Sequence, residues 1–109
     1  MTIVTVKRVR GHIVSVSCLG HTKAAEKGED IVCAGLSSVV QTALLGLMQV
    51  AGIQARFTRD DEEGILIVKL PDILEAGERH DADMILETML CGVSDLADGF
   101  SKYIKLEVK

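Results

Sequence analysis

Tryptophan is absent from this 109-residue sequence, proline occurs once, and aromatic residues make up only 3% of it. The stacking surfaces that single-stranded nucleic acids need are therefore not available. The formal net charge is −4, and the 12 lysines and arginines are spread along the chain. The scarcity of aromatic residues and of clustered basic charge argues against direct binding to nucleic acid.

Cysteine is also sparse, and its pattern argues against a disulfide framework. Cys18, Cys33 and Cys91 are odd in number, widely spaced and contain no CxxC pair. Such cysteines favour a reducing compartment. Residues 1–12 alternate apolar and polar positions and lack the apolar run of a signal peptide. We therefore expect a cytoplasmic protein.

Charged residues are missing altogether from residues 31–53, a stretch as long as a membrane-spanning helix. Several serine, threonine and glutamine residues interrupt it, and basic residues do not flank either end. We expect no membrane span here. The segment is interpreted instead as a helix buried in a protein core or shared at an interface.

What the sequence does contain is a regular succession of short periodic segments, with 48% apolar residues, enough for one domain with its own core. The expected elements are strands over 2–9 and 12–19, a polar loop over 20–30, a helix over 31–51, strands over 53–59 and 64–70, a helix over 78–98 and a strand over 103–108. The order ββαββαβ predicts an α+β fold, a two-layer sandwich in which a mixed sheet carries both helices on one face.

The residues that suggest chemistry surround Cys33. With Asp30 as the N-cap and Gly52 as the stop signal, Cys33 is predicted in the first turn of its helix, where unpaired amides and the helix dipole favour a thiolate. His21, in a glycine-flanked loop, is a candidate to pair with this thiolate and to protonate a leaving amine. Ser37 lies one helical turn after Cys33 and is a candidate to assist at the oxyanion.

Asp30 has two alternative roles in this arrangement. As an N-cap it accepts a hydrogen bond from a backbone amide of the first turn. As an orienting residue it fixes the tautomer of His21. One carboxylate does not easily do both, and its charge opposes the formation of a thiolate, so capping is favoured.

Other interpretations of the same residues are open. By residue type alone, a cysteine near a helix start is more often a packing residue than a nucleophile. Cys18, His21 and Cys33 are also candidate zinc ligands, but a fourth ligand is missing and the spacing matches no common zinc framework, so we expect no metal. Cys18 and Cys91 are expected to be packing residues of a strand and of the second helix.

The pattern Gly20-His21, then Gly28, then Asp30-Ile31-Val32-Cys33-Ala34 and Ser37 resembles the signature of the ribosomal processing cysteine protease family (Prp, YsxB-like). The total length, the order of elements and the run Leu86-Glu87-Thr88-Met89-Leu90 are similar as well. The resemblance thus covers essentially the whole chain, residues 1–109, as a single cysteine protease domain.

This resemblance implies a bacterial endopeptidase that removes a short N-terminal extension from large-subunit ribosomal protein twenty-seven, after a hydrophobic, Phe-rich motif. It implies a catalytic dyad of His21 and Cys33, supporting roles for Asp30, Ser37 and Gly20, no cofactor, and a homodimer. The alternatives are a noncatalytic ribosome-associated module that holds a ribosomal protein tail, and a redox or metal sensor that uses Cys18 and Cys33.

Overall fold

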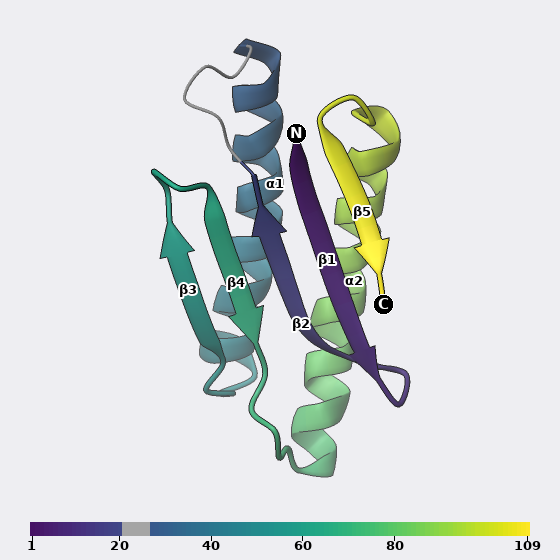
Figure 1. Cartoon of the computed structure of the whole chain (residues 1–109). Coiled ribbons are helices and arrows are strands. Elements are labelled where there is room, and N and C mark those ends of the chain that lie inside the picture. The colour runs from purple at the N-terminus through teal and green to yellow at the C-terminus, as the bar shows by residue number, and fades with distance from the viewer. Residues whose placement is uncertain (21–26) are drawn as a thin grey trace.

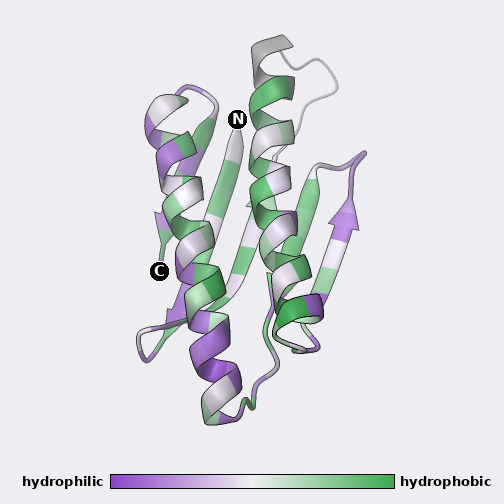
Figure 2. Ribbon diagram, turned by 180° about the vertical axis from the view of Figure 1, so that it is seen from behind, coloured by the Kyte–Doolittle hydropathy of each residue, from purple (hydrophilic) through white to green (hydrophobic). Residues whose placement is uncertain are grey.

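A mixed sheet with two helices on one of its faces makes up the described part of the chain, as Figures 1 and 2 show from opposite sides. The computed structural model describes residues 1–20 and 27–109, with side chains from Ile31 onward in the second part. In chain order its elements are β1 (Thr2–Val9), β2 (His12–Leu19), α1 (Lys27–Leu45), the π-helical turn η1 (Gly46–Val50), β3 (Arg56–Asp60), β4 (Ile65–Lys69), α2 (Ala76–Gly99) and β5 (Ile104–Val108). The predicted α+β fold and its ββαββαβ order are confirmed.

The strand order is β3-β4-β2-β1-β5. β1 pairs antiparallel with β2 and parallel with β5, while β4 pairs antiparallel with both β2 and β3. The first hairpin has the predicted strands, and its turn has positive φ at both Arg10 (54°) and Gly11 (82°). Positive φ at both central residues is the type I′ geometry that matches the twist of the two strands.

The start of α1 differs from the prediction. α1 begins at Lys27 instead of at residue 31, so residues 27–30 are helical and Asp30 lies inside the helix, not at its N-cap. Cys33 consequently falls in the second turn, where the backbone amide is already paired with the carbonyl four residues before it. The cause is local, because Glu29 and Asp30 are residue types favoured in the first turn of a helix and they outweigh the low helix propensity of Gly28.

The end of this helix follows the prediction more closely. After α1 the chain continues through η1, in which the Ala51 amide donates to the Gly46 carbonyl at 2.9 Å. The Ile53 amide then donates to the Leu47 carbonyl at 2.8 Å, and Gly52 between them has a φ of +68°. Gly52 is therefore the predicted stop, since glycine reaches this left-handed conformation without strain.

The core lies between the sheet and the inner faces of the two helices. α1 contributes Val32, Leu36 and Val40 at helical spacing, and β1 contributes Val4 and Val6. Within the described residues, one helical stretch, Ile31–Val50, is long and apolar enough to cross a membrane, and 33% of it is buried. Within the described part of the chain it is therefore buried on the face that packs on the sheet, as expected for the helix layer of a two-layer fold.

α2 packs beside α1 and begins slightly before its predicted start. A capping box accounts for this start, with the Glu75 amide donating to the Glu78 carboxylate at 3.0 Å. Cys91 is exposed on this helix, so its predicted packing role is wrong, whereas Cys18 is buried in β2 as predicted. The helix stripe points Met89 to the core, and position 91 falls on the opposite side of the stripe.

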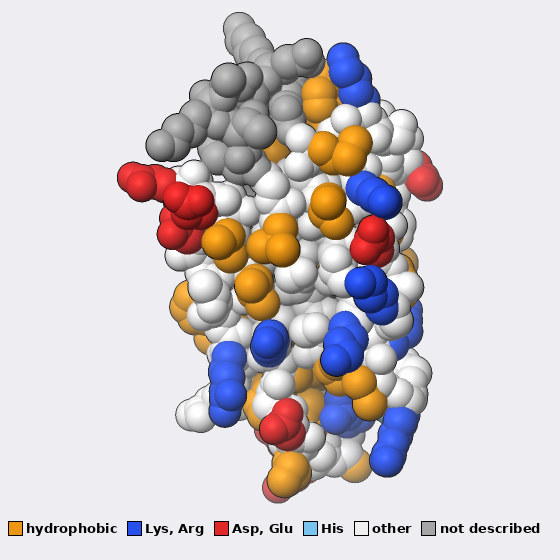
Figure 3. Space-filling view, viewed as in Figure 1, with side chains coloured by type: hydrophobic (Ala, Val, Ile, Leu, Met, Phe, Trp, Pro, Cys, Tyr) orange, Lys and Arg blue, Asp and Glu red, His pale blue; other side chains and the backbone are white. Residues whose placement is uncertain are grey.

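The other face of the sheet is open to solvent (Figure 3). Apolar side chains gather at the end where Ile3 pairs with Leu19, and both of these are exposed. Lysine and arginine side chains gather toward the opposite end, and acidic side chains mark the tip of the β3–β4 hairpin. Along β5 the two signs of charge lie together, with the Lys105 ammonium 3.4 Å from the Glu107 carboxylate.

Candidate active site

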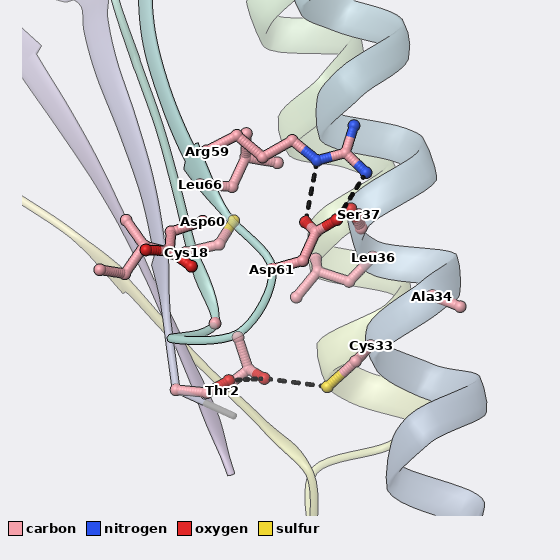
Figure 4. A pocket seen from close by; sticks show the side chains of 13 residues that line it. Thr2, Cys18, Cys33, Ala34, Leu36, Ser37, Arg59, Asp60, Asp61 and Leu66 are labelled. Atoms are coloured by element: carbon pink, nitrogen blue, oxygen red, sulfur yellow. Dashed lines mark hydrogen bonds and ion pairs between the residues drawn. The ribbon is translucent and has the colours of Figure 1, made fainter. Parts of the chain in front are cut away.

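A cavity of about 250 Å³ opens where the second turn of α1 faces the ends of the central strands (Figure 4). Its walls come from β1, β2, the β3–β4 hairpin and α1. The side chains that line it include Thr2, Cys18, Cys33, Ser37, Arg59 and Asp61. The predicted candidates Cys33, Ser37 and Gly20 therefore meet at one place.

Cys33 is half-buried, and its sulfur points from α1 across the cavity toward the first strand (Figure 4). Its Sγ lies 3.2 Å from the Thr2 hydroxyl oxygen. Ser37 stands one turn farther along the helix on the same cavity-facing side, as its predicted spacing required. The sulfur is thus accessible from the cavity while a neighbouring polar group fixes its direction.

Thr2 is a site residue that the sequence reasoning missed. It is buried, with 4% of its surface exposed, and its hydroxyl also donates to the Gly20 carbonyl at 3.0 Å. Its amide donates to the Tyr103 carbonyl at 2.8 Å, so its backbone is anchored to the chain just before β5. No short-range pattern marks this residue, because its contacts join positions far apart in the sequence.

Gly20 supports the site through its backbone. Its φ is +119°, and a Cβ at this position would lie 2.4 Å from the Met1 carbonyl oxygen. Its amide donates to the Gly64 carbonyl at 3.1 Å. Glycine is needed here both for the conformation and for the close approach of the first strand.

Ser37 is held by a chain of hydrogen bonds that reaches across to β3. The Gln41 side-chain amide donates to the Ser37 hydroxyl at 2.6 Å, and an Arg59 guanidinium nitrogen donates to the Gln41 oxygen at 2.9 Å. Because arginine only donates, the Gln41 oxygen faces Arg59 and its NH₂ faces Ser37. The Ser37 oxygen thus accepts from Gln41, which leaves the hydroxyl proton to be donated elsewhere.

Arg59 in turn pairs with Asp61 through two contacts of 2.9 and 3.2 Å. The hydrogen bond to Asp61 and the charge of its carboxylate raise the pKa of Arg59 above its ordinary value. Asp60 accepts from the amides of Glu62 and Glu63, both at 3.1 Å, which holds the hairpin tip in shape. The acidic tip is therefore partly built into the rim of the cavity.

The family model for cysteine protease Prp matches residues 1–105 of this chain. The chain belongs to this family. Ribosomal processing cysteine protease Prp from Bacillus subtilis is 26% identical over 94 residues, which is 86% of this chain and 84% of that protein. The protein of the same name from Staphylococcus aureus strain Mu50 is 27% identical, with 91% of this chain and 90% of that protein covered.

Solved structures of the family have the same fold. A crystal structure of Prp from Staphylococcus aureus in complex with a substrate peptide has a TM-score of 0.88 at 25% identity, over 100% of both chains. A second one, with a covalently linked product peptide, has a TM-score of 0.84 at 26% identity, again over 100% of both chains. The protein is thus a cysteine protease, a hydrolase of the Prp family.

Two thiols border the cavity of this Prp-family protease. Cys18 lies on β2 with 7% of its surface exposed, and burial, together with the nearby Cys33, raises its pKa to about 12. It therefore stays a neutral thiol near pH 7, and neutral thiols are poor nucleophiles and poor metal ligands. Cys33 is the cavity thiol that has the accessible position a nucleophile needs.

Two of the predicted site residues cannot be placed in this cavity. His21 lies outside the described residues, as does the side chain of Asp30, so the His21–Cys33 dyad stays a prediction. The same holds for the zinc alternative with Cys18, His21 and Cys33. Among the side chains that the structure does describe, no group of three or more histidines, cysteines and acidic residues is placed to hold a metal ion.

Proposed function

We propose that this Prp-family protease removes an N-terminal extension from large-subunit ribosomal protein twenty-seven in the cytoplasm. The observation that carries the proposal is the half-buried sulfur of Cys33 at the mouth of a cavity, in a chain whose relatives are named ribosomal processing cysteine proteases. The relative from Staphylococcus aureus has been crystallised with a substrate peptide and with a covalently linked product peptide. Attack by a thiol on a peptide bond passes through a covalent acyl-enzyme intermediate.

In the proposed reaction the Cys33 thiolate adds to the carbonyl carbon of the scissile peptide bond, after transfer of its proton to His21. The carbon–nitrogen bond then breaks, and the leaving amine takes the proton from the His21 imidazolium. Water, deprotonated by His21, hydrolyses the resulting thioester and releases the new carboxylate. Cys33 recovers its thiolate, and no cofactor enters the balance.

The oxyanion of this reaction needs donors other than the Cys33 amide. That amide is paired within α1, because the helix begins at Lys27. The Ser37 hydroxyl supports the proposal instead, since Gln41 occupies its oxygen and leaves its proton to donate. A proposed supporting role for Asp30 is to orient His21, which its place inside the helix leaves open to it.

The charge of the cavity rim supports a basic peptide as the partner. Asp60 and Asp61 line the cavity, and Glu62 and Glu63 follow them at the exposed hairpin tip (Figure 3). Acidic side chains beside an active site attract basic chains and repel the phosphates of nucleic acid. Ribosomal protein tails are basic, so this rim suits the proposed substrate.

The test is incubation of the protein with a peptide that spans the start of the ribosomal protein precursor, followed by mass spectrometry. We expect two products from wild type and an intact peptide from Cys33→Ala, with thermal unfolding as the control for folding. A peptide that binds wild type and stays intact would instead identify a noncatalytic binding module. Equal cleavage by both proteins would exclude Cys33 as the nucleophile.

We also propose that two copies of the chain form a homodimer through the outer face of the helices. A groove of about 550 Å³ lies between α1 and α2, lined by residues such as Val39, Gly46 and Ile85. Leu45 and Met84 are exposed next to it or along it. Burying such apolar surface drives association. Sedimentation should show a dimer for wild type and a monomer for Met84→Glu, and a wild-type monomer would contradict the proposal.

A further inference from the structure

One hydroxyl group joins the sulfur of Cys33 to the backbone that leads into His21. The Thr2 Oγ1 lies 3.2 Å from the Cys33 Sγ and 3.0 Å from the Gly20 carbonyl oxygen, and Gly20 directly precedes His21 (Figure 4). The side chain is well fixed, because Thr2 is 4% exposed and β-branched, and its amide is bonded to Tyr103. Neither the family signature nor the predicted site contains this residue.

Counting protons shows which state of Cys33 this arrangement fits. A threonine hydroxyl has one proton and can accept through its oxygen at the same time. The carbonyl of Gly20 can only accept, so the Thr2 proton points to Gly20. The Thr2 oxygen is then left to accept, so the contact with Cys33 fits a protonated sulfur that donates to Thr2.

We propose that Thr2 is a positioning residue for Cys33 that changes its hydrogen bond when the thiol ionises. Once the sulfur has lost its proton, the hydroxyl faces two acceptors, the neutral carbonyl of Gly20 and the anionic sulfur. Hydrogen bonds to charged acceptors are the stronger ones, so the hydroxyl turns to donate to the thiolate. Thr2 thereby stabilises the nucleophilic form and releases the Gly20 carbonyl.

The release occurs at a backbone that is otherwise held tightly. Gly20 donates its amide to Gly64, and its Cα faces the Met1 carbonyl so closely that no side chain fits. The Thr2 hydroxyl is the contact of Gly20 that the charge of Cys33 can change. Ionisation of the nucleophile is therefore coupled to the backbone residue before His21, an inference that rests on the proposed roles of Cys33 and His21.

The decisive experiment compares Thr2→Val with Thr2→Ser by the rate at which iodoacetamide alkylates Cys33 between pH 5 and 10, as peptide mapping by mass spectrometry measures it. Valine has the shape of threonine without the hydroxyl, and serine keeps the hydroxyl. For Thr2→Val we expect the pH of half-maximal rate to rise by roughly half a unit to one unit. We expect Thr2→Ser to stay close to wild type.

The shape of the pH profile separates this role from a merely structural one. A distorted site would slow alkylation by a similar factor at every pH, whereas loss of the hydroxyl should slow it about 3- to 10-fold at pH 7 and little at the alkaline plateau. Exposed Cys91 is an internal reference for the reagent. Thermal unfolding checks the fold, and Thr2→Ala replaces the valine variant if that variant is unfolded.

An unchanged profile in the folded Thr2→Val protein would overturn the proposal, as would an equal shift in Thr2→Ser. The readout does not depend on any peptide substrate. If wild type does not cut the ribosomal precursor but the shift is found, the proposed substrate fails and the role of Thr2 stands. If wild type cuts the precursor and the profile is unchanged, only the role of Thr2 fails.

Discussion

Cys18 and Cys33 border the same cavity from opposite walls, and their surroundings differ in almost every respect. Cys18 points from near the end of β2 into the core, where burial raises its pKa to about 12. Cys33 points from α1 to the Thr2 hydroxyl group, whose oxygen lies 3.2 Å from its sulfur. Both residues are cysteines of one cavity, so the residue type does not distinguish them. The comparison teaches that the surroundings of the sulfur, which the sheet or the helix provides, decide whether a thiol can serve as a nucleophile.

The largest expected effect is the difference in reactivity between the two thiols. At pH 8 a thiol with a pKa of about 12 has a thiolate fraction of roughly 10⁻⁴, and its burial hinders the reagent as well. We expect iodoacetamide to modify Cys33 at least about 10³-fold faster than Cys18. Time-resolved peptide mapping measures both alkylation rates in one sample. Similar rates would contradict the proposed difference in reactivity between Cys33 and Cys18.

A substitution on the sheet side of the cavity, at Gly20, should have the next largest effect, which is on stability. A Cβ on Gly20 meets the Met1 carbonyl at 2.4 Å and has to adopt a φ of +119°, so Gly20→Ala should push the start of β1 away from Cys33. We expect a loss of about 3 kcal/mol in the free energy of unfolding. Denaturant titration measures this loss.

Gly11→Ala is the matched control for this substitution. Gly11 also has a positive φ, +82°, but open space surrounds the position of its Cβ. We expect a loss of about 1 kcal/mol, from backbone strain alone. Equal losses of unfolding free energy in the two variants would mean that the close approach of the Met1 carbonyl oxygen to Gly20 does not add to the cost of the substitution.

The raised pKa of Cys18 should make stability depend on pH. The unfolded chain loses the thiol proton near its ordinary pKa, whereas the folded protein keeps it up to about 12. The stability that the protonated Cys18 thiol contributes is therefore fully present below its pKa in the unfolded chain. This stability is lost as the pH rises toward the pKa of Cys18 in the folded protein. We expect wild type to lose about 1 kcal/mol per pH unit above pH 9, relative to Cys18→Ala. Parallel curves for the two proteins would contradict this.

The smallest expected effect concerns the α1 side of the cavity, where the side chains of Gln41 and Arg59 position Ser37. Gln41→Leu removes the hydrogen bond to Ser37 and the acceptor for Arg59. We expect kcat/KM for the precursor peptide to fall roughly 3- to 10-fold with little change in stability. Gln49→Leu, at an exposed position of the same helical segment, is the control and should leave kcat/KM unchanged.

Much of the fold could be predicted because its signals are local. The strands of the first hairpin follow from alternation, and its turn follows from Arg10-Gly11, which both adopt positive φ. The start of α1 could not be placed in the same way. Capping and continued helix compete there at Asp30, and the difference between them is small enough for the residues around it to decide.

The site was predicted where its spacing is helical and missed where strands supply it. Cys33 and Ser37 lie one turn apart, and the same i, i+4 spacing from Ser37 to Gln41 would have indicated their hydrogen bond. Thr2 and Arg59 come to this place because β1 pairs with β5 and β2 pairs with β4, and the strands of each pair are distant in the sequence. Their contacts depend on register across the sheet, which a local pattern does not specify.

The sequence by itself determined the order of elements, the apolar faces and the motif that marks the chemistry, because hydrophobic periodicity and family signatures are written in neighbouring residues. Only the tertiary structure decided that Cys18 is a buried acid weakened by desolvation, that Cys33 faces Thr2, and that Arg59 orients Ser37 through Gln41. The physical reason is that burial and side-chain hydrogen bonds depend on contacts between different elements. These contacts form only when the sheet and the helices pack together.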